Sequence, residues 1–233
     1  MPPLLDKVIE VALDFLFPKR CVGCGKEGKF ICDKCLREVR RIFPPVCPLC
    51  GRPYTGGVLC PSCVTWQASV DGIRSPFRFE GIIREAIHQL KYNNIRKLSN
   101  LMASFLNDYL ERYPMKGDVI VPVPLHPKRL RERGYNQSAL LAEELGKIRG
   151  LPVIEGCLVR QKYIKPQAKT LSVLERRKNV EGVFICVDNR LKGKDVLIID
   201  DVSTSGATID ACARAVKSSG AISVRGLVLA REI

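Results

Sequence analysis

The segment Val196-Leu-Ile-Ile-Asp-Asp-Val-Ser-Thr-Ser-Gly-Ala-Thr208 decides the fold. Its first four residues are apolar and mostly β-branched, which predicts a buried strand, and two acids end that strand. A short loop of hydroxyl side chains and glycine follows, and a helix is expected over Ile209–Ser218. Because ligands of open parallel sheets bind where the strands end, this strand, loop and helix predict a ligand site.

The loop after the acids, residues 203–208, is suited to phosphate, and we call it the hydroxyl loop. Backbone N–H groups and hydroxyls at a helix N-terminus attract an anion, and a glycine lets the backbone come close. Asp200 and Asp201 would repel a bare phosphate, but they can accept hydrogen bonds from vicinal hydroxyls of a sugar that carries it. The candidate phosphate-binding residues are Ser203, Thr204, Ser205, Gly206, Ala207 and Thr208.

Strands and helices are expected to alternate on both sides of this segment. The expected strands are Val119–Val123, Val183–Val187 and Val224–Leu229, and the expected helices are Val8–Phe17, Ile82–Tyr92, Leu98–Tyr113 and Gln137–Arg149. Such alternation predicts an α/β fold with a parallel sheet and helices on its faces.

A basic segment, residues 124–133, follows the strand Val119–Val123 and should lie on the same rim as Asp200. Its positive charge suits a second, highly anionic group of the ligand. Residues 160–181 are also basic and could form a lid over the site. The candidate residues of the basic segment are Pro124, Leu125, His126, Lys128, Arg129, Arg131 and Arg133.

Eight of the eleven cysteines form four Cys-x-x-Cys pairs near the N-terminus. Two such pairs supply the four thiolates of a closed, structural zinc site, so two zinc ions are expected. Sequential and interleaved pairing both remain open, and redox dithiols or disulfides are the alternative to metal. The candidate ligands are Cys21, Cys24, Cys32, Cys35, Cys47, Cys50, Cys60 and Cys63.

Composition indicates a cytoplasmic protein with an anionic partner. The net charge is +14, which suits phosphate, nucleic acid or an anionic membrane surface, although it can also serve solubility alone. No secretory signal and no apolar run long enough for a membrane span are expected, so any membrane association would be peripheral. We expect two domains, residues 1–66 with the cysteines and residues 67–233 with the sheet.

The segment from Val196 to Thr208 resembles the phosphoribosyl-pyrophosphate (PRPP) signature of type I phosphoribosyltransferases. The resemblance implies that Asp200 and Asp201 hold the ribose hydroxyls and that the hydroxyl loop holds the 5′-phosphate. It also implies that the basic segment binds pyrophosphate together with Mg²⁺.

The whole set of motifs, from about Phe17 to Ala230, resembles the ComF/GntX family of competence-associated, phosphoribosyltransferase-like proteins. The set includes the cysteine pairs, the segments beginning at Phe79 and Arg133, Lys165-Pro-Gln, and Arg176 with Asn179. The resemblance implies a role with single-stranded DNA, and with other competence proteins, during natural transformation. The alternatives are an active phosphoribosyltransferase with an unknown acceptor and a PRPP-sensing regulator.

Overall fold

The computed structural model describes residues 18–162, 180 and 182–233. Its strands are β1 (Gly72–Arg74), β2 (Phe77–Arg78), β3 (Val119–Pro122), β4 (Leu158–Arg160), β5 (Phe184–Cys186), β6 (Asp195–Ser203) and β7 (Ser223–Arg231). Its helices are α2 (Asp33–Arg37), α3 (Pro61–Val64), α4 (Gly81–Tyr92), α5 (Leu98–Arg112), α6 (Pro127–Arg133), α7 (Gln137–Arg149) and α9 (Ala207–Ser218). The helix expected at Val8–Phe17 and most of the expected lid lie outside the described residues.

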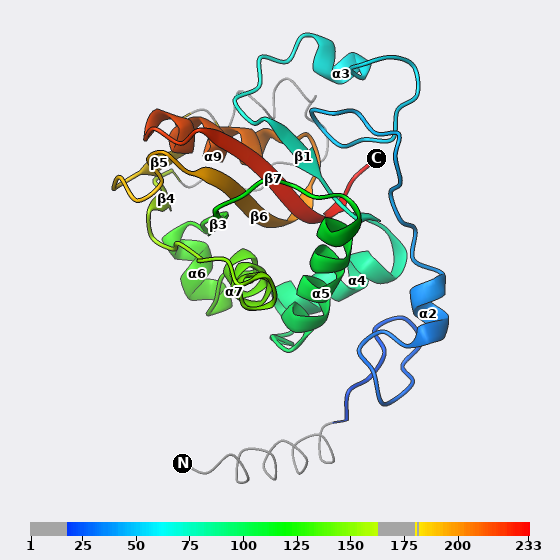
Figure 1. The fold of residues 1–233 in the computed structure, drawn as a ribbon. Coiled ribbons are helices and arrows are strands. Elements are labelled where there is room, and N and C mark those ends of the chain that lie inside the picture. Colours follow the sequence, from blue (N-terminus) through cyan, green and yellow to red (C-terminus); the bar gives the residue numbers. More distant parts are fainter. Residues whose placement is uncertain (1–17, 163–179, 181) are drawn as a thin grey trace.

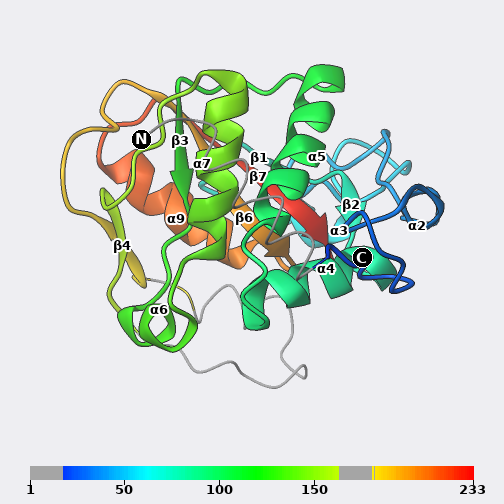
Figure 2. The ribbon, with the colours of Figure 1, turned by 90° about the horizontal axis from the view of Figure 1, so that it is seen from below.

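The main sheet is parallel and has the strand order β1-β7-β6-β3, with β2 also paired to β7 (Figure 1). Helices cover both of its faces, with α9 on one and α4, α5 and α7 on the other (Figures 1 and 2). The predicted α/β fold with a parallel sheet is confirmed.

Alternate residues of the central strand β6 enter two separate cores. Leu197 and Ile199 pack with α4, α5 and α7, whereas Val196 and Ile198 pack with α9. All four side chains are buried, with exposed fractions of 0–1%. An unbroken apolar run is what a strand covered on both faces requires, since successive side chains point to opposite sides.

Two expectations differ from the structure. The strand expected at Val183–Val187 is the shorter β5, which pairs antiparallel with β4 in a separate two-stranded sheet. An apolar run indicates burial but does not name the pairing partner. The basic segment, expected as a loop, contains the helix α6. Pro127 occupies its first turn, His126 accepts a hydrogen bond from the Lys128 N–H (3.2 Å), and Gly134 ends it with φ 79°.

The cysteine-bearing chain lies along the edge of the main sheet, beside β1 and β2. The Ile73 N–H donates to the Leu49 carbonyl (2.8 Å), and the Ile42 N–H donates to the Pro76 carbonyl (2.8 Å). No helix among the described residues combines the length and apolarity needed to cross the bilayer.

Candidate functional site

The two acids predicted to bind a sugar stand at the carboxyl end of β6, inside the strand and not beyond it. Both are almost fully buried, with exposed fractions of 7% for Asp200 and 3% for Asp201. The Val123 N–H donates to the Ile199 carbonyl (3.0 Å), so the start of the basic segment lies beside Asp200. The parallel pairing of β3 and β6 thus brings both predicted segments to one edge of the sheet.

Three polar side chains from the helical layer hold the acids. Ser138 donates its hydroxyl to Asp200 Oδ1 (2.7 Å), and Gln137 donates Nε2 to Asp201 Oδ1 (3.3 Å). Lys91, at the end of α4, forms an ion pair with Asp201 Oδ2. Through Lys91, the end of α4 thus reaches the acids directly.

These surroundings separate the pKa values of the two carboxyl groups. Burial, and then the charge of Asp201, raises the pKa of Asp200 to about 7. Burial acts in the same direction on Asp201, but the Lys91 ammonium outweighs it and holds the pKa of Asp201 below its usual range. At neutral pH the pair therefore holds one full negative charge on Asp201 and a second, partly protonated group on Asp200.

The hydroxyl loop connects β6 to α9, as predicted. Gly206 adopts φ 81° and caps α9, and the Ala207 N–H points at Ser205 Oγ (3.4 Å). A Cβ on Gly206 would lie 2.9 Å from Trp66 Cη2 and 2.9 Å from Ile73 Cδ1, so only glycine fits there. The loop therefore packs against Trp66, which lies three residues after the last cysteine pair.

The basic segment consists of α6 and the three residues that precede it. Lys128 and Arg131 are exposed, whereas Pro124, Leu125, His126, Arg129 and Arg133 are partly buried. Arg133 donates to Gln137 Oε1, which links it through one residue to Asp201. Its guanidinium also lies 5.3 Å from the centre of the Tyr92 ring, and Tyr92 is 59% exposed. Within the basic segment, Arg133 thus has the most direct connection to the acids among the described contacts.

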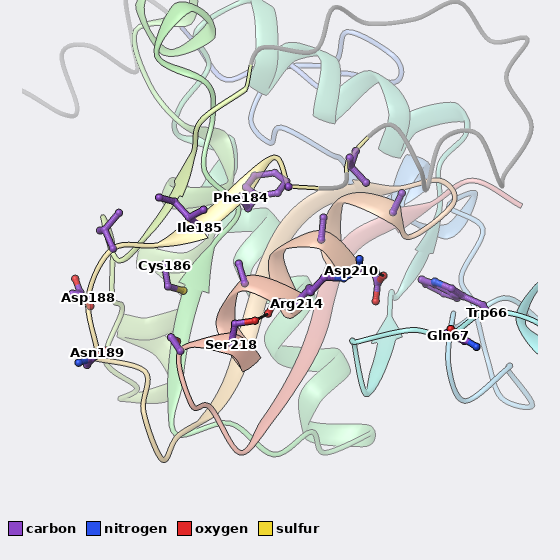
Figure 3. Close-up of a pocket in the computed structure, with 17 residues that line it drawn as sticks. Trp66, Gln67, Phe184, Ile185, Cys186, Asp188, Asn189, Asp210, Arg214 and Ser218 are labelled. Carbon is purple, nitrogen blue, oxygen red and sulfur yellow. Dashed lines mark hydrogen bonds and ion pairs between the residues drawn. The ribbon is translucent and has the colours of Figure 1, made fainter.

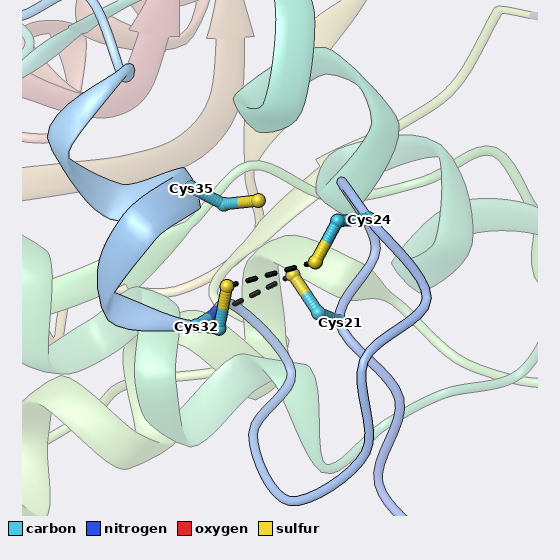
Figure 4. Close-up of side chains that lie close together, drawn as sticks. All are labelled: Cys21, Cys24, Cys32 and Cys35. Atoms are coloured by element: carbon cyan, nitrogen blue, oxygen red, sulfur yellow. Dashed lines mark hydrogen bonds between the residues drawn. The ribbon is translucent and has the colours of Figure 1, made fainter.

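The eight cysteines form two groups of four, and the pairing is sequential. The first cluster is Cys21, Cys24, Cys32 and Cys35 (Figure 4), and the second cluster is Cys47, Cys50, Cys60 and Cys63. Within each cluster all sulfur atoms lie within 4.8 Å of one another. The Sγ atoms of Cys24 and Cys32, and those of Cys50 and Cys60, are 3.7 Å apart.

This geometry fits zinc. A tetrahedron with Zn–S bonds of about 2.3 Å has edges of about 3.8 Å, close to the sulfur separations in both clusters. Burial raises the pKa of Cys21 and Cys47, but backbone N–H groups aimed at their sulfur atoms outweigh it and bring each pKa to about 6. Burial raises the pKa of Cys35 and Cys63 instead. The backbone thus favours the thiolate at one cysteine of each cluster, and the two tetrads fit two structural zinc sites.

A groove of about 720 Å³ lies between α9, β5 and Trp66, and neither Asp200 nor Asp201 lines it (Figure 3). Asp210 and Arg214 of α9 line it together with Phe184 and Cys186 of β5. Of the predicted site residues only Ala207 lines it. This groove is therefore distinct from the strand-end site.

Sequence reasoning missed four residues that contact the site: Gln137, Ser138, Trp66 and Arg231. Gln137 ends the motif that begins at Arg133, which was a usable signal. Ser138 lies one position further, at the start of α7. Arg231, which ends β7, donates to Ser203 Oγ (3.3 Å) and to the Thr204 carbonyl (3.2 Å). No local pattern around Arg231 or Trp66 indicated a role.

Comparison with known proteins identifies the cysteine-rich region and the family of the chain. A double zinc ribbon domain model matches residues 12–64. The chain is 31% identical over 215 residues to competence protein ComFC of Bacillus subtilis, covering 89% of this chain and 86% of that protein. It is 30% identical over 215 residues to DNA utilization protein YhgH of Salmonella typhimurium, covering 87% and 91%.

Among solved structures, a purine phosphoribosyltransferase from Pyrococcus horikoshii aligns with a TM-score of 0.36 and 23% identity, covering 57% of this chain and 71% of that one. The match to ComFC covers most of both chains at 31% identity, and this chain also carries two cysteine tetrads. A match of this extent and identity shows a family relationship. The chain therefore belongs to the ComF family of competence proteins.

Proposed function

We propose that this protein binds PRPP with Mg²⁺ at the carboxyl edge of β6 and handles single-stranded DNA. The observation that carries the proposal is the pair of buried carboxyl groups followed at once by a loop of hydroxyls at the N-terminus of α9. A phosphorylated sugar needs both parts, acceptors for its hydroxyls and N–H groups for its phosphate. The names of the relatives, a competence protein and a DNA utilization protein, support the DNA part.

In this proposal each segment has one task. Asp200 and Asp201 accept hydrogen bonds from the ribose 2′- and 3′-hydroxyls, and the hydroxyl loop surrounds the 5′-phosphate. The basic segment carries the charge opposite the pyrophosphate, and Mg²⁺ would neutralise part of the remaining charge. Lys91 keeps Asp201 ionised, so that an acceptor is ready before the sugar arrives.

The test of the PRPP site is thermal stabilisation by PRPP and Mg²⁺, with the Asp200→Asn/Asp201→Asn variant beside the wild type. At one hundred times the Kd, the ligand should stabilise the wild type by about 2.7 kcal/mol and the variant not at all. Asp33→Asn, which removes an exposed carboxylate far from the strand end, should behave as the wild type does. Equal stabilisation of wild type and double variant, or none in either zinc-loaded protein, would contradict the proposal.

Asp200 gives the unliganded protein a distinctive pH dependence. Its pKa is about 7 in the folded chain and about 3.9 in an unfolded one. Between these values the folded state holds a proton that the unfolded state lacks, so the contribution of Asp200 to stability is fully present at low pH and is lost as pH rises through 7.

Asp200→Asn is neutral in both states and should remove this dependence, which has a maximum slope of about 1.4 kcal/mol per pH unit. The measurement is the free energy of unfolding in denaturant from pH 5 to pH 8. An identical pH profile in wild type and variant would show that Asp200 is ionised throughout that range.

The proposed DNA contact is the exposed face where α4 ends near α6. Tyr92 is 59% exposed, with the Arg133 guanidinium and the His88 ring (4.7 Å between centroids) against it. An exposed ring beside cations can stack on an unpaired base while the cations attract the backbone. The exposed Lys128 and Arg131 add positive charge to α6.

Tyr92→Ala should weaken binding of a labelled oligo-dT about tenfold, since stacking of one base on an aromatic ring is worth roughly 1–3 kcal/mol. The matched control is Phe43→Ala, which removes another exposed ring, 55% exposed, from the chain between the cysteine clusters. Affinity should also fall steeply with salt. A larger loss from Phe43→Ala than from Tyr92→Ala would move the DNA contact to the cysteine-bearing region.

The alternative is an active phosphoribosyltransferase, and the basic segment beside Asp200 favours it because a departing pyrophosphate needs such charge. An acceptor would form a bond to the ribose anomeric carbon as the bond to pyrophosphate breaks. Release of pyrophosphate that depends on an added acceptor would establish turnover. PRPP binding without release would leave binding as the function.

We also propose that the chain works in the cytoplasm, because eight clustered thiolates need a reducing compartment to hold zinc.

Its two proposed domains are residues 1–66 and 67–233. The boundary falls after Trp66, which packs on the hydroxyl loop.

A further inference from the structure

Arg231, the last residue of β7, is a buried charge that the proposed chemistry does not use. Its exposed fraction is 2%. Burying a guanidinium is costly unless negative or hydrogen-bonding groups surround it. Its surroundings therefore indicate what it is for, and they consist of the hydroxyl loop on one side and the second cluster on the other.

On the loop side, Arg231 supports the backbone from behind. It donates Nη1 to Ser203 Oγ (3.3 Å) and Nη2 to the Thr204 carbonyl (3.2 Å). The pairing of β6 with β7 sets Ser203 opposite Arg231, and the Glu232 N–H donates to the Ser203 carbonyl (3.0 Å). Since these bonds use a carbonyl and a hydroxyl at the start of the loop, they fix where its following N–H groups point.

On the other side, Arg231 faces the sulfur atoms of the second cluster. A small cavity separates them, lined by Cys50, Cys63, Thr204, Ser205 and Arg231 among others. Burial lowers the pKa of Arg231; the sulfur charges of the second cluster oppose this shift, and the neighbouring Arg52 adds to it. The Arg231 Nε atom is buried and has no hydrogen-bond partner among the described residues.

Four thiolates around one Zn²⁺ leave two surplus negative charges, so a zinc-loaded second cluster is an ordered counter-charge for this guanidinium. Trp66, three residues after Cys63, adds a second connection because its ring bears on Gly206 at the end of the loop. The second cluster is thus connected to the hydroxyl loop in two ways. Arg231 connects the sulfur charges to Ser203 and Thr204, and Trp66 packs against Gly206.

We propose that Arg231 is a positioning residue that couples the second zinc site to the hydroxyl loop. Zinc in the second cluster then raises the affinity of the loop for a phosphate, and a bound phosphate retards the loss of zinc from that cluster. Reciprocity follows from thermodynamic linkage, because two coupled sites change one another's affinity by the same factor. This inference rests on the proposed PRPP site.

The first experiment measures the Kd for PRPP with Mg²⁺ in the full chain and in Arg231→Met and Arg231→Lys. Methionine keeps the apolar stem and removes the charge, whereas lysine keeps the charge but not the two-pronged contact. We expect about tenfold weaker binding in Arg231→Met, with Arg231→Lys in between. Zinc content, measured by elemental analysis, should remain at two ions per chain in both variants.

The second experiment leaves Arg231 unchanged. A chromogenic chelator reports zinc release from the wild type with and without PRPP and Mg²⁺. PRPP should slow release of one zinc ion about tenfold and leave the other unchanged. The Asp200→Asn/Asp201→Asn variant controls for zinc binding by PRPP itself, and release from it should not respond to PRPP.

The outcomes separate the two proposals. Wild type that fails to bind PRPP would overturn both. Wild type that binds PRPP, combined with unchanged Kd in Arg231→Met or with zinc release that PRPP does not slow, would overturn the coupling alone. Equal slowing of the release of both zinc ions would also overturn the coupling, since the described contacts of Arg231 connect the loop to the second cluster and not to the first.

Discussion

The two cysteine clusters have the same motif and different surroundings. Each has two Cys-x-x-Cys pairs with a glycine directly after the first pair, Gly25 in one and Gly51 in the other. In the first cluster Cys24 is exposed, and the module packs against the start of α4. In the second cluster all four cysteines are buried beside β1 and Arg231. The same Cys-x-x-Cys pairs therefore specify a metal in both clusters, whereas packing decides what the metal supports: Cys21 and Cys35 pack with the core beneath α4, and the second cluster lies against β1 and Arg231.

Removing one ligand from each cluster should give the largest difference in the free energy of unfolding between the two clusters. Cys50→Ser should lower the free energy of unfolding by about 4 kcal/mol, because loss of a buried metal site takes its binding energy from folding. Cys24→Ser should also reduce zinc to one ion per chain but leave the main unfolding transition and its stabilisation by PRPP nearly unchanged. The measurements are denaturant unfolding and zinc content.

If Cys24→Ser lowered the free energy of unfolding as much as Cys50→Ser does, the first cluster would support the domain as strongly as the second. Hydrogen exchange would then show loss of protection spreading from the first cluster into α4 and α5.

The two glycines offer a matched pair with a smaller expected effect. Gly25 has φ 76° and Gly51 has φ 74°, so alanine meets the same left-handed strain of about 1 kcal/mol at both. A Cβ at Gly25 meets nothing within 4 Å, whereas at Gly51 it would lie 2.3 Å from the Ile73 carbonyl oxygen. Gly51→Ala should therefore cost about 3 kcal/mol and Gly25→Ala about 1, measured by denaturant unfolding.

Equal costs at the two positions would show that the second cluster can move away from β1 without loss. A second cluster that moves this freely could not hold Trp66 against Gly206.

Two aspartates give the smallest contrast. Asp210 of α9 accepts the backbone N–H groups of Ser69 (2.6 Å) and Val70 (3.0 Å), just after the second cluster. Asp33, beside the first cluster, pairs in the open with Lys29 (2.9 Å). Asp210→Ala should cost about 2 kcal/mol because two N–H groups lose their acceptor, whereas Asp33→Ala should cost almost nothing. Thermal unfolding in low and high salt measures both, and only the Asp33 effect should vanish with salt.

The sequence predicted the central strand, the parallel sheet and the position of the two acids because these depend on local patterns. The run from Val196 to Ile199 is apolar at every position, which only a strand buried on both faces requires. Cysteine spacing predicted two tetrads, and the structure supplied the pairing. The roles of the hydroxyl loop and the basic segment stay predictions.

What the sequence did not predict depends on contacts between distant segments. Lys91 is followed along the chain by an exposed loop and a helix, and nothing near it indicates that it reaches Asp201. Arg231 looked like an ordinary charge at the end of a strand, and only the fold shows it buried. The helix α6 was missed because its caps, His126 and Gly134, were taken as loop residues of a basic stretch.

The hydrogen bonds that run from the cysteine-bearing chain to β1 and β2 have a consequence for solubility. Residues 40–42 and Leu49 cover the outer side of the sheet, where unpaired N–H and C=O groups would otherwise be free to add strands from another molecule. Zinc bound in the second cluster would hold Leu49 in this place, so we expect removal of zinc to expose the edge of the sheet and to promote aggregation.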